Sequence, residues 1–237
     1  MSRIVDHYDL LLRSIGDRAS EIGSRPVVTH WPHVGSDYRG LVVVGQAVFG
    51  WPDDCQAIQL QSPASRAQLI QSIRGRAERP EPLDWIATHP VRNSPFWKVA
   101  RGVAEALEPA PTPWFSRIAW VNLYPSAPED PRGNPGGALK EAQDPHVGSL
   151  LRAVCGALDA KRVIAVVGPY WRLAATSVGL EDLPEEPRPL YGAGVTEGRT
   201  WVVGWHPNGA SHRHVGADAY TQVIVDAVRR AELTVGA

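Results

Sequence analysis

Four short runs of consecutive apolar residues stand out along the chain. They are GLVVVGQ (40–46), RIAWVNLYP (117–125), RVIAVVGP (162–169) and TWVVGWHP (200–207). Each run is rich in Val, Ile or Trp and stops at Gly, Pro or Asn. Continuous apolarity is typical of strands that are covered on both faces, as in a parallel sheet. The pattern therefore predicts four buried strands.

Segments with helical spacing of apolar residues alternate with these runs. A further stretch at the N-terminus, 1–23, predicts an amphipathic helix that packs on the same domain. The alternation predicts an α/β fold, a three-layer α/β/α sandwich with a central four-stranded, mainly parallel sheet. A chain of 237 residues fits one such domain, spanning 1–237. The predicted helices between and after the strands are 63–78, 94–108, 145–160, 169–180 and 216–233.

The segment after the first strand, GQAVFGWPDD, is a candidate binding turn. Open α/β sheets bind ligands beyond the carboxyl ends of their strands. The segment lacks the glycine spacing of a dinucleotide site and the Gly-Lys-Ser/Thr of a phosphate loop. Its Gly45-Gln46 turn could direct backbone N–H groups at a ligand, and Phe49 and Trp51 could wall a flat ring. The alternative is an ordinary turn whose aromatic residues cap the core.

The second strand carries Asn122 inside an apolar run. A buried Asn needs partners, because an unpaired polar group costs roughly 1–3 kcal/mol. Its carboxamide offers one acceptor and two donors, which could bind the edge of a base or hold a water. The alternative is an Asn whose side chain bonds to neighbouring backbone. The Pro- and Gly-rich segment 125–137 predicts a stiff surface loop, a lip over a cleft.

The segment after the fourth strand, HPNGASHRH (206–214), is cationic. His206 could donate a hydrogen bond to a developing negative charge. Asn208 and Gly209 can form a tight turn that exposes backbone N–H groups. The alternative is a strand-to-helix connection with solvated cations. Four further residues could contact phosphates or enter a duplex: Ser211, His212, Arg213 and His214.

Charge and cysteine content restrict the function classes. The net charge of −1 gives no overall attraction to nucleic acid or anionic membrane, so a polyanion site must be local. Two distant cysteines exclude a C-x-x-C site and a four-cysteine iron–sulfur cluster made by this chain alone. We expect no metal or organic cofactor, no membrane contact and a cytoplasmic location. His30 and His33 could pair on a metal, but without a third ligand nearby a surface loop is the preferred interpretation.

In this order, the three segments resemble the uracil-DNA glycosylase superfamily. The resemblance covers about 40–210, and WVNLYP is closer to its divergent bacterial members. Gly45-Gln46-Ala47-Val48-Phe49 resembles the family's Gly-Gln-Asp-Pro-Tyr segment. Asn122 matches its base-reading Asn, and His206-Pro207-Asn208-Gly209 resembles its His-Pro-Ser-Pro segment.

The resemblance implies a monomeric DNA glycosylase. Such an enzyme flips a base out of single- or double-stranded DNA and hydrolyses its bond to the sugar. Asn122 would bind the base edge, and His206 would stabilise the departing base. The implied base-binding residues are Gly45, Gln46, Ala47, Phe49, Trp51 and Tyr124. The implied DNA contacts are Pro125, Pro207, Asn208, Gly209, Ser211, His212 and Arg213.

The chain departs from the family at Ala47, where relatives often carry the Asp or Asn that activates water. Asp53 or Asp54 could substitute, Asn122 could orient the water, or a dissociative reaction could need little base. The resemblance implies a modified or damaged pyrimidine as substrate: uracil, or a sugar-bearing cytosine of phage DNA that the polar segments 53–62 and 128–146 would accommodate. The rival interpretations are a catalytically inactive binder of the same fold and a nucleotide-binding α/β protein.

Overall fold

The computed structural model describes residues 2–47, 54–129, 134–170, 180, 183, 186, 188–207 and 215–235. Its helices are α1 (Ser2–Asp17), α2 (Ala19–Ile22), α3 (Pro63–Ala77), α4 (Trp85–Thr88), α5 (Pro95–Leu107), α6 (Gly137–Ala157) and α8 (Ala217–Val235). Its strands are β1 (Pro26–Thr29), β2 (His33–Val34), β3 (Leu41–Ala47), β4 (Asp54–Gln56), β5 (Ile118–Tyr124), β6 (Ser126–Pro128), β7 (Arg162–Val166), β8 (Leu190–Thr196) and β9 (Arg199–Gly204). Short 3-10 helices are η1 (Ala57–Gln61), η2 (Pro90–Asn93), η3 (Trp114–Arg117) and η4 (Gly168–Tyr170).

The main sheet has six strands in the order β2-β5-β3-β7-β9-β8. The four predicted runs form its four adjacent parallel strands, β5, β3, β7 and β9. The predicted number of four strands is wrong, because β2 and β8 add an antiparallel strand at each edge. β2 has two residues, and β8 contains Gly192 and Gly194, so neither shows the apolar run that reveals a buried strand.

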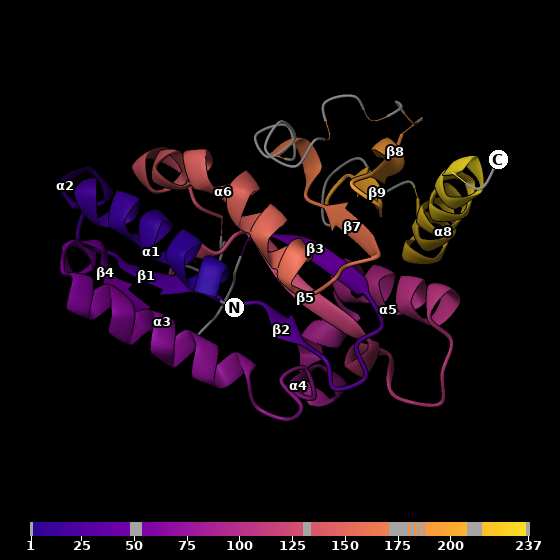
Figure 1. The fold of residues 1–237 in the computed structure, drawn as a ribbon, viewed down its shortest axis with the longest axis horizontal. Helices are drawn as coiled ribbons and strands as arrows, with labels where there is room; N and C mark the ends of the chain where they lie inside the picture. The colour runs from indigo at the N-terminus through magenta and orange to yellow at the C-terminus, as the bar shows by residue number, and fades with distance from the viewer. Residues whose placement is uncertain are drawn as a thin grey trace.

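Both faces of the sheet are covered, as continuous apolar strands require. In β3, Val42 and Val44 pack in a cluster with residues of α1 and α6. Leu41 and Val43 point to the opposite face and pack with residues of α5 and α8. In Figure 1, α1, α2 and α3 gather at the left, and α8 lies at the right beyond β8 and β9. The predicted mixed α/β class is confirmed. The predicted helix 169–180 lies mostly outside the described residues.

A second, three-stranded sheet has the order β4-β1-β6, with both pairings antiparallel. β4 is the next described element after β3, and β6 follows β5 after one residue, Pro125. The hydrogen bonds of this small sheet therefore hold the chain in place at β4 and β6, shortly after β3 and β5 of the main sheet. The predicted polar loops 53–62 and 128–146 are wrong where these elements occupy them. Buried Ala57 and Leu60 hold η1 against the core, and α6 begins at Gly137.

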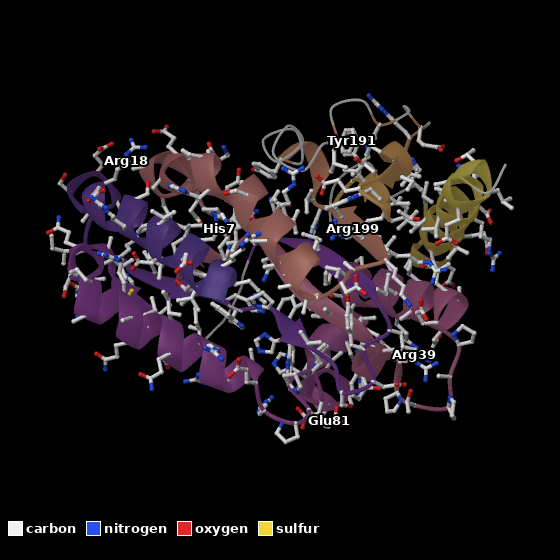
Figure 2. The ribbon with its side chains drawn as sticks, viewed as in Figure 1. His7, Arg18, Arg39, Glu81, Tyr191 and Arg199 are labelled. Atoms are coloured by element: carbon white, nitrogen blue, oxygen red, sulfur yellow. The ribbon has the colours of Figure 1, made fainter. Side chains whose placement is uncertain are left out.

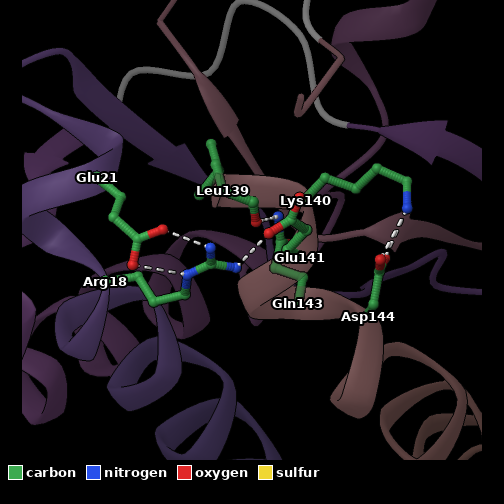
Figure 3. Close-up of polar contacts among 7 residues, drawn as sticks. All are labelled: Arg18, Glu21, Leu139, Lys140, Glu141, Gln143 and Asp144. Atoms are coloured by element: carbon green, nitrogen blue, oxygen red, sulfur yellow. Dashed lines mark hydrogen bonds and ion pairs between the residues drawn. The ribbon is translucent and has the colours of Figure 1, made fainter. Parts of the chain in front are cut away.

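The N-terminal helix packs on α6, where the amphipathic pattern predicted only that a helix over 1–23 would pack on the domain. Tyr8, Leu11 and Ile15 of α1 are all buried. The helix breaks at Arg18, so α2 is a separate turn. Arg18 bonds to Glu21 and lies 2.7 Å from a carboxylate oxygen of Glu141 on α6 (Figure 3). Pairs this exposed contribute little to stability, so the apolar side chains hold α1 in place.

The side chain of Gln143 in α6 forms two hydrogen bonds with the backbone of Ser126 in β6, as the backbone of a neighbouring strand would. Its Oε1 accepts a hydrogen bond from the Ser126 N–H at 3.0 Å, and its Nε2 donates to the Ser126 carbonyl at 2.9 Å. Nε2 also donates to the carbonyl of Leu139 at 3.1 Å (Figure 3). Gln143 and Ser126 are both fully buried. The chain four residues beyond Asn122 is therefore fixed to α6.

His30 and His33 are buried, so the prediction of a surface loop is wrong. They are 0% and 1% exposed, and their rings stack with centroids 4.8 Å apart. The Trp120 ring centroid lies 4.3 Å from that of His30. The cause is β2, which pairs His33 with Trp120 and carries this segment onto the edge of the main sheet. The hydroxyl of Tyr8 donates to the His30 carbonyl at 2.6 Å.

We expect the free energy of unfolding to fall as the pH drops below about 6.5, the ordinary histidine pKa. Burial lowers the pKa of His33 to about 4 and that of His30 well below its ordinary value. The unfolded chain therefore binds protons that the folded protein does not. Each imidazole then costs about 1.4 kcal/mol per pH unit below its unfolded pKa, until its folded pKa is reached.

Urea unfolding between about pH 7.5 and 4.5 measures this loss. His33→Asn removes one titrating ring and keeps a donor for the Trp31 carbonyl, which lies 2.7 Å from the His33 Nδ1. The variant should lose less stability than the wild type over the same range. Equal pH dependence in the two proteins would contradict the assignment.

No helix among the described residues is long and apolar enough to cross a membrane.

Candidate functional site

The carboxyl ends of β3, β5, β7 and β9 meet at one edge of the main sheet, because these strands are parallel. β3 and β5 pair Gly45 with Asn122 and Ala47 with Tyr124. His206 comes two residues after β9 ends. A Cβ atom on Gly168, just beyond β7, would lie 3.7 Å from the His206 nitrogen. The sheet thus brings the predicted residues of three strand ends to the same edge.

Asn122 lies directly against the backbone of Gly45. A Cβ atom at residue 45 would lie 2.7 Å from the Asn122 Oδ1, so only glycine leaves room for the carboxamide. Asn122 is 4% exposed, and its Nδ2 has no hydrogen-bond partner among the residues that the structure describes. Leaving such a donor unpaired costs roughly 1–3 kcal/mol. A bound acceptor at this place would recover that cost.

The Phe96 ring lies near both Gly45 and His206, and the sequence did not predict it as a site residue. Its ring lies 3.4 Å from the position of a Cβ atom on Gly45. The ring is also nearly parallel to the His206 imidazole, with centroids 6.2 Å apart and planes at 9°. Ser94 caps α5 by accepting from the Trp97 N–H, so Phe96 lies in the first turn of this helix. An aromatic residue in a helix is no local signal of a site, because its place beside His206 depends on the fold.

The backbone that carries His206 is held on both sides. The Trp205 N–H donates to the Pro189 carbonyl at 3.0 Å. The Trp205 carbonyl accepts from the hydroxyl of Tyr220, at 2.8 Å, and Tyr220 is 1% exposed. Burial raises the pKa of Tyr220, so its hydroxyl stays protonated and remains a donor. His206 itself is half-buried, and Pro207 is buried. The imidazole therefore projects from a fixed piece of chain.

Two of the predicted base-binding residues are half-buried. Gln46 donates from Nε2 to Oδ1 of Asn134, at 3.2 Å. Ala47 lies at the end of β3 and, as a methyl group, supplies no base. A hollow of about 390 Å³ adjoins Asn134 and is lined in part by Val27 and Leu139. The Gln46–Asn134 hydrogen bond thus links the end of β3 to the segment just before α6.

Tyr124 and Pro125 face protein rather than an open site. Tyr124 is 1% exposed, and its hydroxyl donates to Oδ1 of Asp144 at 2.8 Å. Its ring meets the ring of Tyr170 edge to face, with centroids 5.7 Å apart, and the Lys140 Nζ lies 5.6 Å from its centroid. A base could stack on Tyr124 only after these neighbours moved. Pro125 is buried, and its carbonyl accepts from the backbone N–H of His30 at 2.9 Å.

The remaining predicted site residues lie outside the described part of the chain. They are Phe49, Trp51, Asp53, Asn208, Gly209, Ser211, His212 and Arg213. Within the described ranges, no three His, Cys, Asp or Glu side chains form a group that could hold a metal ion. The structure shows a buried amide donor and an aromatic ring against Gly45, with the His206 imidazole parallel to that ring. These groups offer N–H donors next to an apolar surface.

No family model matches the chain, and a search of the curated proteins finds no match.

Proposed function

We propose that the protein is a DNA glycosylase of the uracil-DNA glycosylase superfamily. It would flip a modified or damaged pyrimidine and hydrolyse the bond to its sugar. The observation that carries the proposal is the Asn122 carboxamide, buried against Gly45 beside the Phe96–His206 pair. A sheet with helices on both faces, a three-layer α/β/α arrangement, agrees with the fold that the resemblance implies.

Asn122 suits the recognition of a flipped base. A base inside a duplex cannot reach a buried carboxamide, so flipping must come first and costs a few kcal/mol. Among the described residues the Asn122 Nδ2 has no hydrogen-bond partner, so a base carbonyl that reached it could accept its N–H. Forming this bond removes the cost of the buried unpaired group, which offsets part of the flipping cost. Selectivity follows, since a base without an acceptor there would leave the donor unpaired.

His206 suits the bond-breaking step. Negative charge develops on the departing base as its bond to the sugar lengthens, and an N–H donor at that place lowers the barrier. The Tyr220 and Pro189 hydrogen bonds hold the backbone beside His206 before the reaction begins. Donors that are already oriented stabilise charge without having to reorganise. Phe96, parallel to the imidazole, supplies an apolar wall that helps to exclude water.

Ala47 leaves three routes for the attacking water. Asp53 or Asp54 could act as the base, Asn122 could orient the water, or the bond could break before the water attacks. The substrate we favour is a sugar-bearing cytosine in phage DNA, with uracil as the alternative. In the phage case the enzyme would act in the cytoplasm as a monomer on invading DNA.

A base-release assay tests the proposal. Purified protein is incubated with uracil-containing DNA, unmodified DNA, and phage DNA with glucosylated hydroxymethylcytosine, and alkali-labile abasic sites are counted. We expect sites on one modified DNA only. Asn122→Ala and His206→Ala should each lower their number about 100-fold or more, the usual loss when one such donor is removed.

Ala47 favours a second candidate, a DNA binder of the same fold without catalytic activity. It would show salt-dependent affinity for DNA and produce no abasic sites. Folded wild-type protein that leaves all three DNAs intact would contradict the glycosylase. Uracil release without release of the glucosylated base would assign the enzyme to uracil repair.

A further inference from the structure

Arg188, Trp205 and Tyr191 form a stack beside the site. The rings of Tyr191 and Trp205 are nearly parallel, with centroids 5.2 Å apart and planes at 16°. The Arg188 guanidinium lies over the Trp205 ring, with Cζ 5.6 Å from the centroid. Trp205 and Tyr191 are half-buried, whereas Arg188 is exposed. The two stacked rings thus support the positively charged Arg188 guanidinium at the protein surface.

The stack lies at the same sheet edge as the site. β8 pairs with β9 antiparallel and matches Leu190 with Gly204, the last residue of β9. The residues just before β8 therefore lie beside those just after β9, and His206 directly follows Trp205. Figure 2 labels Tyr191 near one end of this hairpin and Arg199 near the other. Trp205 of the stack and His206 of the site are adjacent residues, and hydrogen bonds to Pro189 and Tyr220 hold the Trp205 backbone.

The charge of Arg188 is not neutralised within the described part of the protein. No ion pair or hydrogen bond of its guanidinium with another described residue is present. The nearest described acid along the chain, Glu186, already bonds to Arg230 at 2.9 Å. A guanidinium that lies over an indole keeps its N–H donors at the ring edge, directed outward. Such a planar set of donors fits two oxygens of a phosphate.

We propose that Arg188 binds a backbone phosphate of the DNA strand that flanks the base held at Asn122 and His206. The inference rests on the proposed function, since it takes DNA as the ligand. Trp205 and Tyr191 hold the guanidinium in place, which reduces the side-chain freedom that binding must remove. The contact orients the strand and is independent of base identity.

The test measures DNA affinity against salt for wild type, Arg188→Ala, Arg188→Lys and Arg229→Ala. The probe is a short duplex with one tetrahydrofuran abasic analogue, which needs no knowledge of the excised base. Arg229 is the matched control, an exposed arginine on α8 with no ion pair among the described residues. Its neighbours on α8 bond elsewhere: Arg230 bonds to Glu186, and Glu232 bonds to Arg162, the first residue of β7.

Arg188→Ala should weaken binding about tenfold and lower the slope of log affinity against log salt by about one. Arg229→Ala should change neither. Arg188→Lys should recover part of the slope and less of the affinity, because an ammonium cannot form the planar pair. Duplexes with one phosphate at a time replaced by neutral methylphosphonate locate the contact. One replacement should weaken the wild type and have no further effect on Arg188→Ala.

Equal binding by Arg188→Ala and Arg229→Ala would overturn the inference, as would methylphosphonate effects that are the same in wild type and Arg188→Ala. Base release by the wild type reports separately on the proposed function. If the wild type releases a base and Arg188→Ala binds normally, only the Arg188 inference fails. If the wild type binds through Arg188 but releases nothing, the contact stands and the glycosylase fails. If it binds no probe, both fail.

Discussion

Replacing Gly45 with alanine should lower base release about 100-fold and leave the protein folded, because small displacements of a reacting geometry have effects of this size. The new methyl group would lie 2.7 Å from the Asn122 Oδ1 and 3.4 Å from the Phe96 ring. The carboxamide is the end of a side chain and can rotate away, whereas the β3 backbone stays paired with β5 and β7. The amide donor of Asn122 would then point elsewhere, while the strand remains intact.

The measurement compares single-turnover base release by Gly45→Ala, Asn122→Ala and the double variant. If both changes act through the same carboxamide, the double variant should be no slower than Asn122→Ala. Gly75→Ala is the matched control, since a Cβ atom there meets nothing within 4 Å. That change lies within α3 and should raise stability by about 0.5–1 kcal/mol with activity unchanged. Full activity in Gly45→Ala would remove the central support for the site.

Replacing Gln143 with alanine should lower the free energy of unfolding by about 2–5 kcal/mol. Three hydrogen bonds are lost, and the Ser126 N–H and carbonyl remain buried without their partner. An unsatisfied buried group costs roughly 1–3 kcal/mol. Urea unfolding near neutral pH, with the wild type measured alongside, gives the value directly.

Two further variants make the Gln143 result specific. Gln143→Glu keeps an acceptor for the Ser126 N–H but, when ionised, cannot donate to the carbonyl, so it should also destabilise. Gln71→Ala on the exposed face of α3 should change stability by at most about 0.5 kcal/mol. A loss at Gln143 no greater than that at Gln71 would show that Ser126 finds other partners.

The parts of the fold that the sequence predicted are those with a local pattern. The four parallel strands were readable because strands buried on both faces need a continuous apolar run. β2 and β8 were not, since two residues and a glycine-containing segment give no such run. The helix expected from 145 begins at Gly137, with Pro145 in its interior. A Pro is more typical of a first helical turn, so the pattern placed the start too late.

The site divides in the same way. Asn122 was recognisable because a polar side chain inside an apolar strand is locally unusual. Phe96 was not, because an aromatic residue in a helix is ordinary until the fold places it beside His206. His30 and His33 were misread because two histidines without a third metal ligand nearby suggested a surface loop, whereas β2 pairs His33 with Trp120 of distant β5. Such long-range contacts leave no mark in any short stretch of sequence.

The small sheet has a consequence for engineering the protein. Residues 48–53 run from β3 of the main sheet to β4 of the small one, and residues 130–133 run from the end of β6 toward Asn134. Gln46 bonds to Asn134, and the Glu129 N–H bonds to the Pro26 carbonyl of β1, so described residues next to both stretches are held by hydrogen bonds. Changes in 48–53 would alter the predicted roles of Phe49, Trp51 and Asp53, while the paired strands that carry Gly45 and Asn122 keep their hydrogen bonds. A library randomised at these positions would therefore separate the contribution of these two stretches from that of the sheet.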